Sequence, residues 1–150
     1  MSQYVLITGT GREMALGYNF VRRYLEQGDH VIATVRRPSE ALERLQARYP
    51  DTLHIQLMDI GSTESVNAAA EKVAEYAPCL DLIINNAVTT SPDTNKELEE
   101  FDLDTIMPAL NVATVGPLRV IKAFLPLLRK SRGTALIVNI SSEAGSIGAC

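Results

Sequence analysis

The chain has little cysteine, no excess of positive charge and no long hydrophobic run, and each absence excludes a class of protein. Its 150 residues include two cysteines, Cys79 and Cys150, too few for a disulfide framework or a paired CxxC metal site. The 14 basic and 18 acidic residues give a net charge of −4, so we expect no nucleic-acid partner. Apolar runs such as residues 5–7 and 82–84 are too short to span a bilayer, so no membrane partner is expected.

The chain also lacks a secretory signal, a repeat and any shift in composition. Residues 1–4 lead into a strand pattern without a basic or an apolar leader segment, which predicts a cytoplasmic protein. Apolar residues make up 46% of the chain and charged residues 21%, as is usual for globular domains. We therefore expect one domain, residues 1–150, able to bury a core.

What the chain does contain is a regular alternation of two apolar patterns. Short buried strands are expected at residues 4–7, 30–35, 53–58, 80–85 and 135–140. Amphipathic helices are expected at residues 16–27, 39–49, 62–76 and 103–130, the last bent near Gly116 and Pro117. The polar residues 89–100 predict a mobile loop. This alternation predicts a doubly wound α/β fold with a parallel sheet in the order 3-2-1-4-5.

In such sheets a ligand lies where the strand order reverses, beyond the carboxyl ends of the strands. Residues 8–17, a glycine-rich turn from the first strand to the first helix, and residues 85–88 are expected there. Backbone N–H groups of such a turn and the start of its helix can hold a pyrophosphate. The alternative is a turn that needs glycine for positive φ and binds nothing.

The end of the second strand indicates which dinucleotide binds. Arg36 and Arg37 follow this strand, no carboxylate occurs before Glu40, and Arg12 lies in the glycine turn. An acid at this point suits the ribose hydroxyl of NAD, whereas guanidinium groups match a 2′-phosphate. We therefore expect NADP(H), with NAD(H) less favoured; the alternative is solvated arginines at a strand end.

Several motifs, in the right order on the expected elements, resemble the short-chain dehydrogenase/reductase family. They are Thr8-Gly9 with Ala15 and Gly17, Asp59-Ile60, Asn85-Asn86-Ala87, Asn111, and Val138-Asn139-Ile140-Ser141-Ser142. The stretches 116–118 and 127–129, with Ser142 followed by Gly145-Ser146-Ile147, are most similar to sniffer-type carbonyl reductases. The resemblance extends from Thr8 to Gly148 and implies a Rossmann fold. Together with the glycine turn and the arginines, it predicts these cofactor-binding residues: Gly9, Thr10, Gly11, Arg12, Ala15, Leu16, Gly17, Arg36, Arg37, Asp59, Ile60, Asn86, Ala87 and Val88.

The resemblance also implies hydride transfer between a nicotinamide and a small carbonyl or alcohol substrate. By resemblance, Ser142 would hydrogen-bond the substrate carbonyl and Asn111 would hold a water in a proton relay. The family's YxxxK motif supplies a tyrosine that gives the proton and a lysine that assists it. No tyrosine follows Tyr76 and no lysine follows Lys130, so we expect an N-terminal part of the fold, without the family's last strands. The 150 residues are then expected to bind cofactor and to be inactive alone.

The chain departs from the family pattern in ways that keep other functions open. The glycine turn is longer than usual, which puts Glu13 and Ala15 at usual glycine positions, and Val88 replaces the last glycine of NNAG. One alternative is a non-catalytic nucleotide-binding or interaction module, and another is a degenerate fragment that binds nothing. The fifth strand should form an exposed sheet edge, which favours self-association, so a homo-oligomer is expected.

Overall fold

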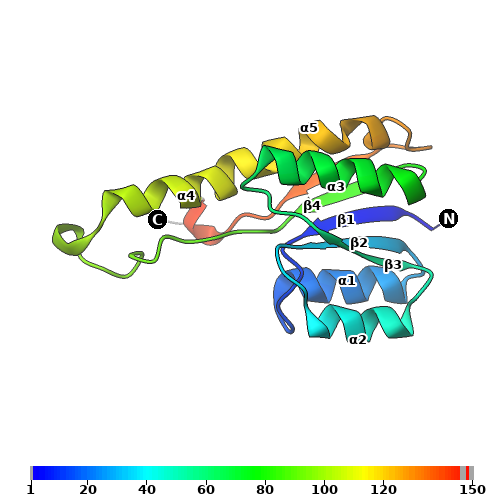
Figure 1. Ribbon diagram of the computed structural model, residues 1–150, viewed down its shortest axis with the longest axis horizontal. Helices are drawn as coiled ribbons and strands as arrows, with labels where there is room; N and C mark the ends of the chain where they lie inside the picture. Colours follow the sequence, from blue (N-terminus) through cyan, green and yellow to red (C-terminus); the bar gives the residue numbers. More distant parts are fainter. Residues whose placement is uncertain (1, 146–147, 149–150) are drawn as a thin grey trace.

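A parallel sheet of five strands forms the centre of the computed structural model, which describes residues 2–145 and 148 (Figure 1). The strand order is β3-β2-β1-β4-β5, which confirms the predicted doubly wound topology. The strands are β1 (Tyr4–Thr8), β2 (His30–Val35), β3 (Leu53–Leu57), β4 (Leu82–Asn85) and β5 (Leu136–Asn139). Ser146, Ile147 and Cys150 lie outside the described residues, so the part of the sniffer-type resemblance that rests on 146–147 is not placed.

Helices cover both faces of this sheet (Figure 1). α1 (Leu16–Glu26) and α2 (Glu40–Arg48) cover one face, and α3 (Thr63–Tyr76) and α5 (Gly116–Leu128) cover the other. Ser39 accepts a hydrogen bond from the Leu42 N–H at the start of α2, and Ser62 accepts one from the Ser65 N–H at the start of α3. The two serines are the first residues of the ranges 39–49 and 62–76 that the sequence predicts as helices.

The alternation of side chains along each strand divides the core in two. Leu6 and Ile83 are fully buried in the cluster that contains the apolar faces of α3 and α5. Val5 and Ile7, the neighbours of Leu6 on β1, are equally buried in the cluster that contains α1 and α2. Each such side chain contributes about 1.5–3 kcal/mol of burial energy. Both faces of the sheet are covered, which agrees with the continuous apolar residues in the middle of β1 and β4.

The bend expected near Gly116 and Pro117 is a π-helical segment, Asn111–Val115, between α4 (Ile106–Leu110) and α5. The Gly116 N–H donates to the carbonyl of Asn111, five residues back, and Pro117 has no N–H to continue an α-helical ladder. A Cβ on Gly116 would lie 2.9 Å from Cδ1 of Ile60. Glycine at this position therefore lets the helix lie directly against the end of β3.

The helical region Leu103–Leu128 is long and apolar enough to cross a membrane by length and composition alone, with a mean hydropathy of 1.2. Packing against the sheet also accounts for apolar residues in this helical region. Val120 and Phe124 of α5 are fully buried against the sheet, and Leu127 is nearly so. A core helix of a soluble protein meets the same criterion as a membrane span, so the expectation of no membrane partner stays a prediction.

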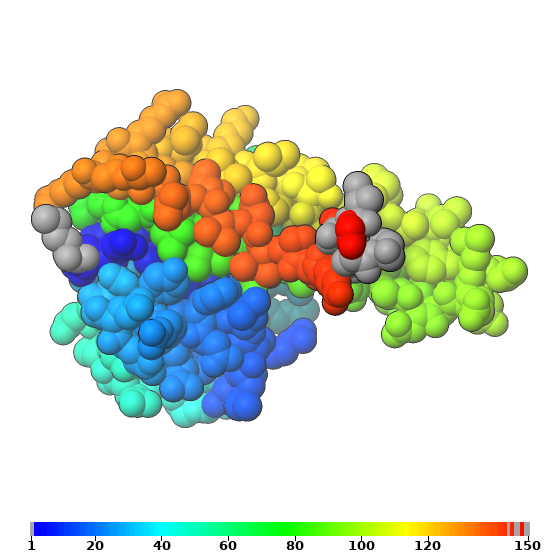
Figure 2. All heavy atoms as spheres, turned by 180° about the vertical axis from the view of Figure 1, so that it is seen from behind, coloured from blue at the N-terminus to red at the C-terminus, as the bar shows by residue number. Residues whose placement is uncertain are grey.

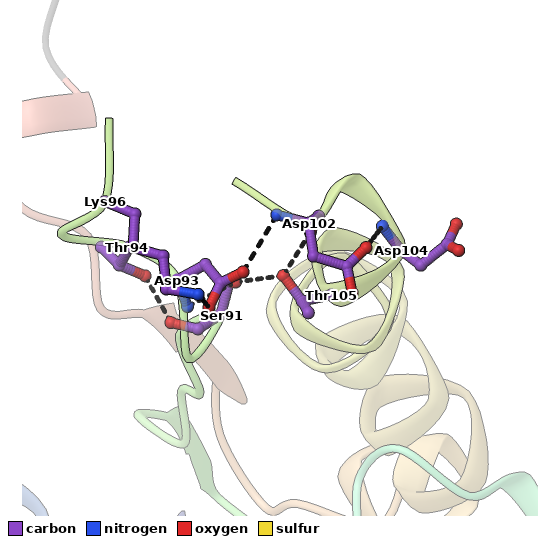
Figure 3. A network of polar contacts seen from close by, with 7 residues as sticks. All are labelled: Ser91, Asp93, Thr94, Lys96, Asp102, Asp104 and Thr105. Atoms are coloured by element: carbon purple, nitrogen blue, oxygen red, sulfur yellow. Dashed lines mark hydrogen bonds and ion pairs between the residues drawn. The ribbon is translucent and has the colours of Figure 1, made fainter. Parts of the chain in front are cut away.

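The loop between β4 and α4, which the sequence predicts to be mobile, has a hydrogen-bonded structure of its own (Figure 3). Asp93, only 6% exposed, pairs with Lys96 Nζ at 2.8 Å and accepts a hydrogen bond from the Asp102 N–H at 3.0 Å. Ser91 and Thr105 join their hydroxyl groups across the loop. Short 3₁₀ turns, Leu98–Glu100 and Leu103–Thr105, complete the segment. The polar side chains of this loop thus form a network of hydrogen bonds and one ion pair.

We expect this network to loosen in acid. The hydrogen bond from Lys96, followed by that from the Asp102 N–H, holds the pKa of Asp93 below its ordinary 3.8. Because the folded pKa is the lower one, the stabilisation is complete above 3.8 and is lost as the pH falls through the folded value. The protection of the Asp102 amide against hydrogen exchange, relative to the unfolded chain at the same pH, should therefore fall below about pH 3.8. Asp93→Asn is the control, and equal protection of that amide in acid and at neutral pH would contradict the prediction.

β5 forms one edge of the sheet and is exposed along its length (Figure 2). Leu136 is 55% exposed and Ile137 is 41% exposed, whereas the strands between β3 and β5 are buried. The predicted exposed edge is confirmed. Self-association through it stays a prediction.

Candidate functional site

A cleft of about 600 Å³ opens where β1 turns into α1, between the ends of β2, β3 and β4. This is the point at which the strand order reverses, as the sequence predicts. All the predicted cofactor-binding residues line the cleft except Thr10 and Asp59. Six lining residues were not predicted: Thr34, Val35, Pro38, Met58, Thr89 and Val112. All six lie at or just after the carboxyl ends of strands or on the π-helical segment, which is the signal that could have identified them.

Two glycines let the turn lie directly on the end of β4. Gly9 has φ +73°, and a Cβ there would lie 2.7 Å from the Cα of Ala87. A Cβ on Gly17 would lie 2.5 Å from Asn86 Nδ2 and from the Gly9 carbonyl oxygen. Neither position can carry a larger residue without moving backbone atoms, so these glycines fix the shape of the cleft floor.

Thr8 and Asn86 fasten this turn to β4. The Thr8 hydroxyl accepts hydrogen bonds from the N–H groups of Asn86 and Ala87, at 3.0 and 2.9 Å. In return, Asn86 Nδ2 donates to the carbonyl oxygens of Thr8 and Gly9, at 3.0 and 3.2 Å. The Asn86 side chain is thus directed at the turn, and its effect on a ligand comes through the position of that turn.

The start of α1 has the features of an anion site. Ala15 precedes the helix and gives no side-chain cap, and the first turn has no acidic residue. Within the described residues, the N–H groups of Leu16 and Gly17 have no acceptor, and both residues line the cleft. Free N–H groups at a helix N-terminus bind phosphate oxygens.

The extra length of the glycine turn is directed away from this helix start. Met14, with φ +66°, is 87% exposed, and it occupies a left-handed conformation that favours glycine. Glu13 forms a 2.9 Å ion pair with Arg44 of α2, and the Ser39 hydroxyl donates to the Gly11 carbonyl at 2.8 Å. The added residues are therefore tied to α2 and leave the N–H groups of the helix open to the cleft.

The charge of the cleft is positive. Arg12, Arg36 and Arg37 line it, all three are exposed, and no Asp or Glu is among its lining residues. In the part of the chain that the structure describes, none of the three forms an ion pair with a carboxylate. Three guanidinium groups without acidic partners favour a ligand with several anionic oxygens.

A family model for short chain dehydrogenases matches residues 3–150. The chain belongs to the short-chain dehydrogenase family. It is 35% identical to the short chain dehydrogenase gsfK of Penicillium aethiopicum, over 99% of this chain and 60% of that protein. It is also similar to solved structures. The NADPH-bound carbonyl reductase from chicken fatty liver matches with a TM-score of 0.84 and 31% identity, over 98% of this chain and 60% of that one.

The putative carbonyl reductase Sniffer of Caenorhabditis elegans matches with a TM-score of 0.77 and 28% identity, over 99% of this chain and 66% of that one. Since the chicken enzyme matches with a higher TM-score, the sniffer-type subgroup stays a prediction. The chain spans about three fifths of the length of the gsfK protein and of the chicken reductase.

Two predicted cofactor residues of this member of the short-chain dehydrogenase family do not line the cleft. Thr10 is fully buried and its hydroxyl donates to the Thr34 carbonyl at 3.1 Å. Asp59 accepts the Gly61 N–H at 2.8 Å, which shapes the turn after β3 and leaves Ile60 as the lining residue. In this structure both side chains bond to backbone groups next to the cleft and so fix the position of that backbone.

The two predicted catalytic residues are also outside the lining of the cleft. Asn111 Nδ2 donates to the Gly61 carbonyl at 2.9 Å, and its Oδ1 accepts from Arg119 at 2.7 Å. Both ends of this side chain therefore have protein partners, and the expectation that Asn111 holds a relay water stays a prediction. Ser142 lies exposed in the turn after β5, where its carbonyl accepts the Gly145 N–H at 3.0 Å. Its catalytic role stays a prediction.

Proposed function

We propose that the protein carrying this chain is an NADP(H)-dependent oxidoreductase that interconverts a small carbonyl compound and its alcohol. The observation that supports NADP(H) over NAD(H) is the trio Arg12, Arg36 and Arg37, which line a cleft that no carboxylate lines. An acidic residue at the end of β2 would bind the ribose hydroxyl of NAD and would repel a 2′-phosphate. The likeness to an NADPH-bound carbonyl reductase agrees with the proposal and leaves the cofactor of this chain to be tested.

The lining residues fit such a dinucleotide from one end of the cleft to the other. The N–H groups of Leu16 and Gly17 would hold the pyrophosphate. Arg36 and Arg37 would hold the 2′-phosphate, beside the apolar ends of β2 and β3. Val88 and the end of β4 lie on the other side of the strand reversal, where the nicotinamide would lie. The nicotinamide, when bound, supplies or accepts a hydride.

Substrate binding is assigned to the ends of β4 and β5. Asn85 Nδ2 donates to Asn139 Oδ1 at 2.9 Å, and the Ile140 N–H donates to the Asn85 carbonyl at 2.9 Å. These bonds fix the backbone that leads to Ser142. Ser142 therefore comes directly after the strand ends at which the ligand would bind. The proposed role of Ser142 is to donate a hydrogen bond to the substrate oxygen.

The proton donor is not among the residues that line the cleft. No tyrosine and no lysine lines it within the described part of the chain. Tyr76 lies against His54 at the other edge of the sheet, and burial raises its pKa to about 12, which makes it a poor acid near neutral pH. We propose that the family's YxxxK motif, in the whole protein, supplies this acid. A protein without it would be a nucleotide-binding module.

Cofactor titration tests the proposal. We expect NADPH to bind at least about tenfold more tightly than NADH, because each charge-assisted contact to the 2′-phosphate adds affinity. The binding is measured by NADPH fluorescence, with 2′,5′-ADP as a competitor that carries the same phosphate. Failure of both nucleotides to bind a folded chain would contradict a dinucleotide site. Binding without carbonyl reduction by the whole protein would favour the module.

A further inference from the structure

Arg119 of α5 forms a group of hydrogen bonds that the family motifs do not explain. Its Nε donates to the Thr63 hydroxyl at 2.9 Å, and one terminal nitrogen donates to the Ile60 carbonyl at 3.2 Å. The other terminal nitrogen donates to Asn111 Oδ1 at 2.7 Å. A fourth, longer contact of 3.4 Å reaches the Asn111 carbonyl. All these acceptors are uncharged, and Arg119 has no carboxylate partner among the described residues.

These bonds join two segments that are distant in the sequence and that both line the cleft. Ile60, from the turn after β3, and Val112, next to Asn111 in the π-helical segment, are lining residues. Asn111 adds a second link through its bond to the Gly61 carbonyl. The absence of a side chain at Gly116 lets Ile60 lie against the helix. One guanidinium group and one carboxamide therefore set the separation between the two segments.

A planar guanidinium group suits this position and an ammonium group does not. Arginine directs its N–H groups along fixed directions in one plane, and here they reach acceptors on both segments. Lysine is a point charge on a flexible chain and cannot hold all three acceptors in place at once. Arg119→Lys therefore keeps the positive charge and removes the planar arrangement of N–H donors.

We propose that Arg119 is a positioning residue for the cofactor: through Asn111 and Ile60 it holds the wall of the cleft formed by Ile60 and Val112. The inference rests on the proposed function, because it requires a dinucleotide in this cleft. Ile60 comes from the β3 side of the strand reversal, where the adenosine half of a dinucleotide lies in such sheets. Loss of Arg119 should consequently weaken NADPH and 2′,5′-ADP together.

The test compares Arg119→Met and Arg119→Lys with Arg129→Met, a change of an exposed arginine just after α5 that lies outside the cleft. NADPH and 2′,5′-ADP are titrated at a temperature at which circular dichroism shows each variant folded. We expect Arg119→Met to weaken both ligands about tenfold, Arg119→Lys to recover only part of the loss, and Arg129→Met to change nothing. In free Arg119→Met, the amide NMR signals of Gly61 and Val112 should shift.

The outcomes separate the inference from the function on which it rests. A wild-type chain that binds neither ligand overturns the proposed function itself. A wild-type chain that binds NADPH, with folded Arg119→Met binding it equally well, overturns the inference alone, even if the variant melts earlier. Should Arg119→Met not fold, Thr63→Val removes a single acceptor. It should weaken NADPH about two- to threefold, and unchanged binding in that variant counts against the inference.

Discussion

Gly17→Ala should abolish measurable NADPH binding and lower the free energy of unfolding by about 2–3 kcal/mol. The added Cβ would lie 2.5 Å from Asn86 Nδ2 and 2.5 Å from the Gly9 carbonyl oxygen. Because the second of these atoms belongs to the backbone, the turn itself has to move. The movement would displace the N–H groups at the start of α1 that we assign to the pyrophosphate. Urea denaturation and NADPH titration measure the two effects.

Gly133→Ala is the matched control for this change. A Cβ at Gly133 meets nothing within 4 Å, and the residue lies between α5 and β5, far along the chain from the glycine turn. It should leave unfolding and NADPH binding unchanged to within about 0.5 kcal/mol. Wild-type NADPH affinity in Gly17→Ala would remove the glycine turn from the cofactor site.

The second large effect is expected from reversing the charge at the end of β2. The double variant Arg36→Glu/Arg37→Glu should lose about 100-fold or more in NADPH affinity, while NADH binding stays within about threefold. The introduced carboxylates would repel a 2′-phosphate that the guanidinium groups attract, whereas NADH has no phosphate at this position. Fluorescence titrations with both nucleotides measure the change in preference.

The double variant Arg129→Glu/Arg132→Glu controls for the change in net charge, because both exposed residues follow α5 and neither lines the cleft. The difference between the double variant and the wild type should shrink as salt is raised, since exposed charges are screened. Equal losses for NADPH and NADH would mean that the arginines do not recognise the 2′-phosphate, and the proposed cofactor would be wrong.

The fold could be predicted because its information is local and repeated along the chain. Val5, Leu6 and Ile7 form a continuous apolar run, which is typical of a strand covered on both faces. Ser39 and Ser62 mark helix starts because their hydroxyls accept from the first turn of the helix that follows. Alternation of such strands with helices leaves few topologies, and right-handed crossovers select among them.

The outline of the cleft could be predicted for the same reason. The partners of side chains that bond to distant parts of the chain could not be predicted. Twelve of the predicted cofactor residues line it because they follow directly from strand ends and the glycine turn. Asn111 was expected at the relay position by resemblance to the family. The π-helical segment shifts the phase of that helix, and Arg119 and Gly61 take both ends of the carboxamide. Neither partner is visible from the sequence around Asn111.

The structures of the polar loop and of the lengthened turn also depend on partners that the local sequence does not show. The composition of residues 89–100 shows only that they are polar, whereas the network depends on Asp93 meeting the Asp102 N–H and on Ser91 meeting Thr105. Counting residues shows that the glycine turn is long, but where the extra length goes depends on Arg44, which pairs with Glu13 from the next helix.

By itself, the sequence determined the doubly wound sheet, its strand order, the helix caps, the position of the cleft and the basic character of one end of it. These features depend on apolar periodicity and on residues close together in the chain. Only the tertiary structure decided that Asn111 is bound by Arg119 and Gly61, that Asp59 and Thr10 lie behind the lining, and that Val112 and Met58 belong to it. The physical reason is that the direction of a polar side chain is set by the nearest free donor or acceptor. In this fold such a partner often comes from an element distant in the chain.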